Sequence, residues 1–369
     1  MRKFLLLLLV VALLFIGISA WCFDASTPPN QRNAILYSWD GAQREHVKEC
    51  LSRNELPNLA ALIAEGKIVD IDITSHNTDT KAGHTQMLTG YDPDVTGVMS
   101  NGKFKAVAPG LSIFERLDQT YGKDNIATMM VTGKTHHVGS CPPSTPEAIA
   151  NAKKKLEQLQ AKPAAANKKK KAAAQADNGT TGVVDPDAAA QAGKKKQAAG
   201  QGLKAIIQNT DGEPFYNTVK ALDVWDGEKG RTHDVSGPLM MGYLDKYGKG
   251  RFCAFFHFSD PDHMGHGHGE NSKEYNDAII DCDKELGLAV KKLKDLGIYD
   301  KTMIFVTADH GFDEGKTSHS NAPTVYLAAD MKSLAKNGDQ RDLVPTILTE
   351  MGVDVSKLEP KYTGTMLTK

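Results

Sequence analysis

Three short hydrophobic runs in the chain each end at a cluster of charged residues. Residues 34–39 lead into Asp40-Gly41, residues 252–258 into the segment 260–268, and residues 303–308 into Asp309-His310-Gly311. Continuous runs of β-branched and aromatic residues are typical of strands buried in a parallel sheet. Open α/β sheets bind their ligands at the carboxyl ends of such strands. We therefore expect the three polar clusters to meet in one crevice.

Between these runs, the hydrophobic positions alternate between the spacing of helices and that of strands. The predicted helices lie at 45–65 (broken at Pro57), 81–90, 272–296 and 342–351. Further strands are predicted at 68–73, 126–131 and 324–328. Such alternation favours a doubly wound α/β fold, in which helices cover both faces of a mostly parallel sheet. We expect one such domain over residues 21–369.

A low-complexity segment interrupts this pattern at about 151–202. It consists of Lys blocks, Ala runs, Gln and Gly, so it cannot bury enough apolar surface to order itself. We interpret it as a solvated insertion, with contact to an anionic surface as the alternative. Residues 151–200 hold 11 Lys and four acidic residues, a surplus of +7. The formal net charge of -1 thus leaves -1 - 7 = -8 elsewhere, which argues against a nucleic-acid-binding surface.

The N-terminus has the pattern of an export signal. Met1-Arg2-Lys3 precedes an apolar stretch from Phe4 to Ile18, which Ser19-Ala20 follows. We predict a signal peptide over residues 1–20 and a secreted or periplasmic protein. The stretch is short for a bilayer span of roughly 20 residues, so no stable membrane span is expected in the mature chain. A retained anchor is the alternative. The five dispersed cysteines imply no disulfide framework.

The strand-end clusters have the chemistry of metal ligands. Asp309 and His310 are adjacent, and His319 follows nine residues after His310. Several carboxylates in one crevice would repel one another, and a bound cation is the simplest way to offset that repulsion. Asp and His ligands favour zinc, although manganese remains possible. Taken alone, Asp309-His310 could equally be a helix-capping Asp beside a surface His.

Thr80 is the candidate nucleophile. It precedes the predicted helix 81–90, so its hydroxyl would lie at a helix N-terminus, where backbone N–H groups stabilise an alkoxide and an attached oxyanion. The alternative is that Thr80 only caps the helix.

The order of these motifs resembles a known family. Thr80-Lys81-Ala82-Gly83-His84, Asp262-His263-Met264-Gly265-His266 and Asp309-His310-Gly311 follow Asp40-Gly41. This order is similar to that of the alkaline phosphatase superfamily, and most similar to its type I phosphodiesterase/nucleotide pyrophosphatase branch. The resemblance covers about residues 33–140 and 215–350. It implies an alkaline-phosphatase-like fold and a hydrolase of phosphoric esters that uses two divalent metal ions and a covalent phospho-threonine.

The resemblance also implies roles for individual residues. Asp262, His266 and His319 would hold one ion. Asp40, Asp309 and His310 would hold the second ion beside the Thr80 oxygen.

Three further residues would contact the substrate. Asn101 matches an asparagine that holds a phosphoryl oxygen in the phosphodiesterase branch. Lys134 and His136 lie in Gly133-Lys134-Thr135-His136, which resembles an element that contacts the sulfate in sulfatases. On the local sequence, Asn101 could instead be a turn residue, and Lys134 and His136 could belong to a solvated loop.

The expected partner is a small phosphate ester or nucleotide. Diesters are favoured over monoesters because Asn101 is a neutral donor, whereas Lys134 and His136 would favour a phosphomonoesterase. Sulfatase chemistry is disfavoured because Thr80-Lys81-Ala82-Gly83 cannot supply formylglycine. A phosphosugar mutase shares the Thr-x-x-Gly-His arrangement, but an export signal fits it poorly. The alternative that is not an enzyme is a binding protein stabilised by metal ions, without turnover.

Overall fold

A single sheet organises the protein. The computed structural model describes residues 23–173, 199–200 and 202–369, so the predicted signal peptide lies outside the described residues. Eight strands are ordered β4-β3-β5-β1-β6-β7-β2-β8. Their bounds are β1 Asn33–Trp39, β2 Lys67–Asp72, β3 Ala127–Thr132, β4 Val224–Gly227, β5 Phe252–Phe258, β6 Thr302–Thr307, β7 Thr324–Ala329 and β8 Gly338–Asp339.

The centre of the sheet is parallel and fully buried. Strand β1 pairs in parallel with β5 on one side and β6 on the other. Every residue of these three strands is buried, as their uninterrupted hydrophobic runs predict. Only β7 runs antiparallel to its neighbours, β6 and β2. The three central strands therefore end at the same edge of the sheet.

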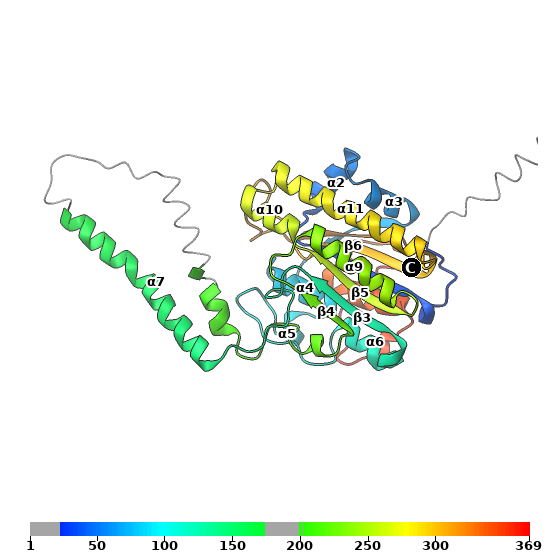
Figure 1. The fold of residues 1–369 in the computed structure, drawn as a ribbon, viewed down its shortest axis with the longest axis horizontal. Helices are drawn as coiled ribbons and strands as arrows, with labels where there is room; N and C mark the ends of the chain where they lie inside the picture. The colour runs from blue at the N-terminus through cyan, green and yellow to red at the C-terminus, as the bar shows by residue number, and fades with distance from the viewer. Residues whose placement is uncertain (1–22, 174–198, 201) are drawn as a thin grey trace, which may run out of the picture.

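Helices cover both faces of this sheet (Figure 1). One face carries α2 Arg44–Ser52, α3 Pro57–Glu65, α9 His233–Tyr247, α10 Asp260–His268 and α11 Lys273–Asp295. The other carries α4 Thr80–Thr89, α6 Ile113–Tyr121 and α12 Leu343–Glu350, with the short α5 Pro93–Thr96 beside them. The predicted doubly wound α/β class is confirmed. The region 45–65 forms two helices rather than one interrupted helix.

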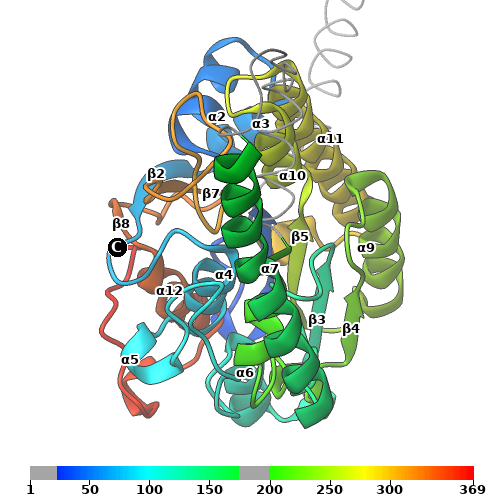
Figure 2. The ribbon, with the colours of Figure 1, turned by 90° about the vertical axis from the view of Figure 1, so that its left-hand side faces the viewer.

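The Lys/Ala-rich segment differs from the expectation over residues 151–173. These residues belong to α7, Pro146–Ala173, which extends away from the sheet (Figures 1 and 2). Ala and Lys are strong helix formers, so a helix needs little tertiary packing here. The segments on either side run next to each other, since Ser144 N donates to Asn209 O at 2.7 Å and Phe215 N to Gly139 O at 3.2 Å. That residues 151–202 are an insertion in one domain stays a prediction.

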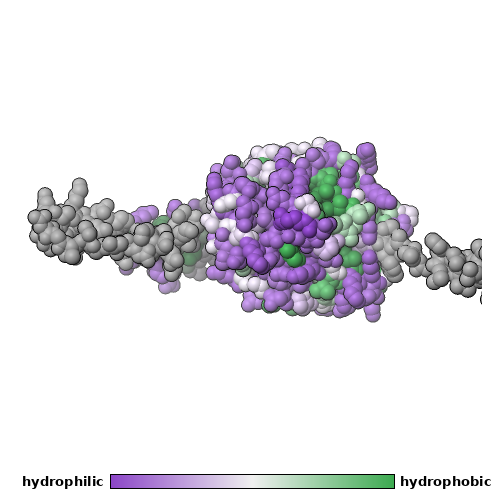
Figure 3. Space-filling view, turned by 90° about the horizontal axis from the view of Figure 1, so that it is seen from above, coloured by the Kyte–Doolittle hydropathy of each residue, from purple (hydrophilic) through white to green (hydrophobic). Residues whose placement is uncertain are grey.

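The surface seen in Figure 3 is mostly hydrophilic, with patches of hydrophobic side chains. Three large hydrophobic residues are exposed in the part of the chain that the structure describes: Ile206, Val235 and Leu288. No helix within the described ranges is long and apolar enough to cross a membrane.

Candidate active site

The strand-end clusters meet at the carboxyl edge of the central strands, as expected, and this meeting place is called the crevice below. Asp40 follows β1, Asp309 follows β6, and Asp262 lies in the first turn of α10 directly after β5. Because these strands are neighbours and parallel, the three carboxylates lie close together. Three groups of three ligand atoms form there within the described residues, with the atoms of each group within 4.8 Å of one another. Two of them are the ligand sets that the family resemblance implies.

The outer triad, Asp262, His266 and His319, reaches the surface. Asp262 and His266 are one turn apart on α10, and His266 Nε2 lies 3.3 Å from Asp262 Oδ1. His319, in the loop before β7, brings its Nε2 to 3.2 Å from His266 Nε2. The side chain of His266 is 45% exposed, so this triad can be reached from solvent.

The inner triad, Asp40, Asp309 and His310, is completely buried. His310 Nε2 lies 3.7 Å from Asp40 Oδ1 and 3.4 Å from Asp309 Oδ2. It is also 3.9 Å from Asp262 Oδ1, so the inner and outer triads adjoin each other.

Each of the three carboxylates has one oxygen engaged by the protein and one without a hydrogen bond. His257 donates to Asp40 Oδ2, Gly41 N to Asp309 Oδ1, and Lys134 to Asp262 Oδ2. The other oxygens, Asp40 Oδ1, Asp309 Oδ2 and Asp262 Oδ1, are buried and accept no well-oriented hydrogen bond from any described residue, although His84 Nδ1 lies 3.2 Å from Asp309 Oδ2. An unpaired buried carboxylate oxygen is costly. These three oxygens are also the ones that face the histidine nitrogens.

The three histidines of the triads present the matching nitrogen. A backbone carbonyl lies at each Nδ1: Thr317 O at 2.9 Å from His266, Thr78 O at 2.6 Å from His319 and Gly311 O at 2.9 Å from His310. A carbonyl only accepts, so Nδ1 carries the proton and a neutral ring keeps a lone pair on Nε2. Metal-binding histidines are oriented in this way. The chemistry of the donor set therefore fits divalent metal ions.

Charge in the crevice supports the same conclusion. Burial acts to raise the pKa of Asp40 and Asp262, yet the neighbouring Lys134 ammonium holds both pKa values well below the usual range. Burial lowers the pKa of His319 to about 4, with His310 adding to the effect. His310 itself has a raised pKa, because Asp309, Asp262 and Asp40 outweigh its burial. The crevice thus keeps several negative charges and attracts cations.

Thr80 is the first residue of α4 and lies against the inner triad. Its Oγ1 is 3.3 Å from His310 Nε2, and its side chain is buried. The close approach of α4 to the sheet depends on Gly83, where a Cβ would lie 2.3 Å from the Asp309 carbonyl oxygen. The glycine of the Thr-x-x-Gly-His segment thus allows the helix N-terminus to reach the strand ends.

Asn101 lies at the same helix N-terminus. Its Oδ1 accepts from Lys81 N at 2.9 Å, and its own N donates to Asp79 Oδ2 at 3.1 Å. The side chain therefore caps α4 across the loop, which the local sequence did not reveal. None of the described hydrogen bonds uses its Nδ2 donor.

Lys134 and His136 take different positions from each other. The Lys134 ammonium lies 2.9 Å from Asp40 Oδ2 and also pairs with Asp262, so it joins the two triads. His136 is exposed, and its Nδ1 lies 3.3 Å from the sulfur of Cys141. The structure therefore brings Lys134 to the metal-ligand candidates, whereas His136 has no hydrogen bond or ion pair with them in the part of the chain that the structure describes.

Two buried histidines at this site, His84 and His257, are not indicated as site residues by the sequence motifs. His257 lies inside strand β5, where its neighbours are hydrophobic and a strand residue gives no motif. His84 belongs to the Thr-x-x-Gly-His segment, one turn after Thr80, but a helical histidine alone does not reveal a contact with Asp309.

Comparison with known proteins identifies the family of the chain. The type I phosphodiesterase / nucleotide pyrophosphatase family matches residues 34–347, and the chain belongs to this family. The branch predicted from the motif order is confirmed.

Individual relatives are similar over smaller parts. A 2,3-bisphosphoglycerate-independent phosphoglycerate mutase of Clostridium perfringens is 34% identical over 124 residues, 30% of this chain and 22% of that protein. A phosphopentomutase of Limosilactobacillus reuteri is 32% identical over 151 residues, 37% of this chain and 36% of that protein. The chain thus spans about a fifth to a third of the curated relatives it matches.

One solved structure supports the fold. A protein in complex with its substrate D-glucosamine-2-N,6-O-disulfate superposes with a TM-score of 0.53 at 13% identity, covering 92% of this chain and 79% of that one.

Proposed function

We propose that the protein is a two-metal phosphoric-ester hydrolase of the phosphodiesterase/nucleotide pyrophosphatase type, with Thr80 as its nucleophile. The observation that carries this proposal is the set of three unpaired carboxylate oxygens that face three histidine Nε2 atoms beside Thr80. A binding protein would need metal ligands for stability, but not a buried hydroxyl at a helix N-terminus next to them.

In this proposal the outer triad holds one divalent ion and the inner triad, with Thr80, holds the other. Zinc suits the Asp and His donors best, and manganese is the alternative. When bound, the two ions would supply Lewis acidity toward the attacking and leaving oxygens.

The chain's own groups would carry the reaction through a covalent intermediate. Thr80 Oγ1 forms a bond to phosphorus as it loses its proton, and the bond to the leaving alcohol breaks as that oxygen gains one. Water then cleaves the phospho-threonine, which restores the Thr80 hydroxyl and releases the second product. Backbone N–H groups at the start of α4 and the free Nδ2 of Asn101 would bind the non-bridging phosphoryl oxygens.

A diester fits the proposed site better than a monoester. The second full charge of a monoester calls for an available cation, since charge-assisted hydrogen bonds are about twice as strong as neutral ones. The Lys134 ammonium is already paired with Asp40 and Asp262, and His136 is exposed. Nucleotides and other small phosphodiesters are therefore the proposed substrates, and contacts from Lys134 and His136 to the substrate stay predictions.

The decisive experiment combines metal analysis, intact mass and turnover. Wild-type protein should contain two ions per chain and hydrolyse a bis-aryl phosphate with a higher kcat/KM than the aryl monophosphate. Thr80→Ala should keep most of the metal and its melting temperature but lose turnover. It should also lose the covalent adduct, which with a bis-aryl phosphate has the mass of one aryl phosphoryl group and in wild type forms on about the timescale of one turnover. Thr80→Ser should be the mildest change. Near-wild-type activity in Thr80→Ala would refute Thr80 as the nucleophile. A kcat/KM for the monoester more than about tenfold higher, roughly 1.4 kcal/mol, would refute the preference for diesters.

A phosphosugar mutase is the second candidate, because both curated relatives described above are mutases. A mutase would return the phosphoryl group to another hydroxyl of the same molecule instead of to water. Product analysis by phosphorus NMR with a pentose phosphate separates the two reactions, since only hydrolysis yields inorganic phosphate. Metal binding without turnover of any ester would instead support a binding protein.

We also propose that the protein is exported to the periplasm or the medium, because residues 1–20 have the pattern of a signal peptide. Export would be tested by N-terminal sequencing of the protein from the extracellular and periplasmic fractions. A mature N-terminus close to residue 21 is the expected result, and an uncleaved cytosolic protein would contradict it.

A further inference from the structure

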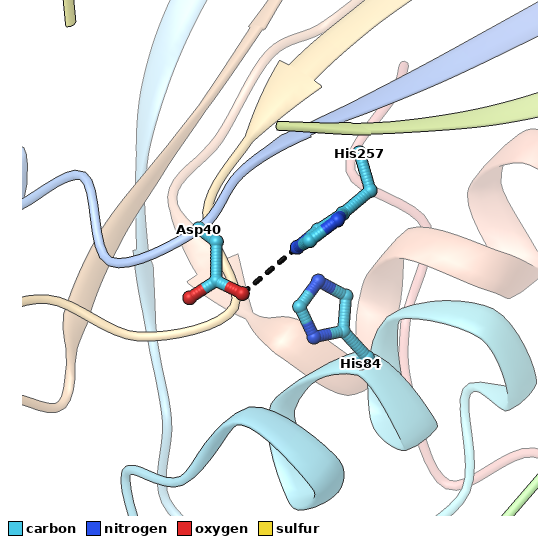
Figure 4. A group of neighbouring side chains, drawn as sticks. All are labelled: Asp40, His84 and His257. Carbon is cyan, nitrogen blue, oxygen red and sulfur yellow. Dashed lines mark hydrogen bonds and ion pairs between the residues drawn. The ribbon is translucent and has the colours of Figure 1, made fainter. Parts of the chain in front are cut away.

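A third histidine–carboxylate group shares Asp40 with the inner triad. Asp40, His84 and His257 bring three ligand atoms within 4.8 Å of one another, and all three side chains are buried (Figure 4). His84 comes from α4 and His257 from β5, and their rings meet edge to face with centroids 5.0 Å apart. The group could be a third metal site or a support for the inner triad.

The hydrogen bonds of His257 define its proton position. Gly133 N donates to its Nδ1 at 3.3 Å, and Thr132 Oγ1 lies 3.0 Å from the same nitrogen. Since an N–H group can only donate, Nδ1 must be the accepting nitrogen. The ring proton is therefore on Nε2, which donates to Asp40 Oδ2 at 2.8 Å. His257 thus fixes one oxygen of Asp40 and leaves the other directed at the inner triad.

His84 contacts other members of the site, although its ring lies next to that of His257. Its Nδ1 lies 2.9 Å from the carbonyl oxygen of Thr80 and 3.2 Å from Asp309 Oδ2, so this nitrogen carries the proton. Its Nε2 accepts from the Ser38 hydroxyl at 2.8 Å. The ring therefore ties the first turn of α4, which carries Thr80, to Asp309 and to strand β1.

These hydrogen bonds argue against a third ion. Both nitrogens of His84 and both nitrogens of His257 already have protein partners, so neither ring offers a free lone pair to the space between them. The inner and outer triads differ in the carboxylate oxygens that their Nε2 atoms face. Asp40 Oδ1, Asp309 Oδ2 and Asp262 Oδ1 accept no well-oriented hydrogen bond from the described residues. Asp40 Oδ2, the oxygen next to His257, is instead already paired with His257 and Lys134.

We propose that His84 and His257 are positioning residues, which hold Asp40, Asp309 and Thr80 in the geometry of the inner metal site without binding metal themselves. This inference rests on the proposed two-metal function. Partners that orient metal ligands typically change metal affinity or activity by about 10–100-fold when they are removed.

The test uses a matched pair of substitutions at His257. His257→Gln keeps an N–H donor near the position of Nε2, whereas His257→Leu removes it at similar volume. Each variant and the wild type are equilibrated in zinc buffers of defined free concentration. Bound zinc per chain is then measured by atomic emission, and melting temperatures are recorded for the metal-free proteins.

We expect His257→Leu to bind one of its two ions about 10–100-fold more weakly and to lose kcat more than it raises KM. His257→Gln should stay within about fivefold of wild type. His84→Asn and His84→Leu form a second pair, in which Asn keeps the donor near Nδ1, should His257→Leu fail to fold.

The outcomes separate this inference from the proposed function. Wild-type protein with fewer than two ions and no turnover would contradict the proposed function itself. Two ions in the wild type with unchanged affinity in both Leu variants would overturn only the positioning role. Equal losses in Leu and in the donor-keeping variants would show a packing role, and a third ion that disappears in the Leu variants would show a metal site.

Discussion

Replacing Gly83 by Ala should separate activity from stability. The new Cβ would lie 2.3 Å from Asp309 O, and contacts become ordinary only at 3.4 Å. The helix or the strand end must therefore shift by about 3.4 - 2.3 = 1.1 Å. Asp309 is fully buried at the end of the central strand β6, so we expect α4 to move. A 1 Å misplacement of a reacting group costs roughly 100-fold in rate.

The expected change in stability is much smaller. Alanine gains about 0.8–1 kcal/mol over glycine inside a helix. Overpacking costs about 1–3 kcal/mol, so the net loss is about 0–2 kcal/mol. Gly242→Ala in α9 is the matched control, because a Cβ at Gly242 meets nothing within 4 Å. That variant should gain up to about 1 kcal/mol and keep full activity.

The assay is kcat/KM on a bis-aryl phosphate, measured beside urea unfolding and metal content for both variants. Gly83→Ala should lose about 100-fold in kcat/KM, equivalent to about 2.7 kcal/mol, while most of its stability remains. If Gly83→Ala kept its activity within about fivefold, the close approach of α4 to Asp309 would not position Thr80.

Two further predictions concern regions outside the crevice. Replacing residues 151–200 with a short Gly/Ser linker should change the melting temperature by only a few degrees and keep activity on small esters, because the flanking segments are hydrogen-bonded to each other. Loss of soluble protein would contradict this prediction. Burial lowers the pKa of His46, but its partners Cys50 and Glu270 outweigh burial and raise it to about 10 from 6.5. The raised pKa stabilises the folded protein fully below pH 6.5, and this stabilisation is lost as the pH rises through 10. The urea midpoint of the wild type should therefore fall between these pH values, and the midpoint of His46→Gln should fall less steeply.

Much of the fold followed from local hydrophobic patterns. The runs at 34–39 and 252–258 differ from β1 and β5 by at most one residue, because fully buried parallel strands leave an uninterrupted apolar signal. The antiparallel direction of β7 could not be predicted, since its sequence fits either direction. The helix over 151–173 was not predicted, because the lack of large apolar residues indicates only that the segment buries little surface. The formation of α7 depends on helix propensity instead.

The site residues that lie in short sequence motifs could be predicted, whereas those that stand alone in the sequence could not. Asp309-His310 and Asp262 with His266 stand out because adjacent or one-turn spacing is visible in sequence. His257 is different: only the pairing of β5 with β1 brings its ring to Asp40. The ion pairs of Lys134 likewise arise from the neighbouring ends of β3 and β5.

The difference in exposure between the two triads has a consequence for how the proposed centre would fill and empty. His266 is 45% exposed, whereas Asp40, Asp309 and His310 have no exposed surface. The outer triad adjoins the inner one and reaches the surface through His266, so we expect an ion at the inner position to exchange with solvent more slowly than one at the outer position. Exchange with a chelator would then occur in two kinetic phases, a fast phase from the outer position and a slow phase from the inner one. A brief exposure to chelator would leave a long-lived form with one ion, and isotope replacement during that interval would label the two positions separately.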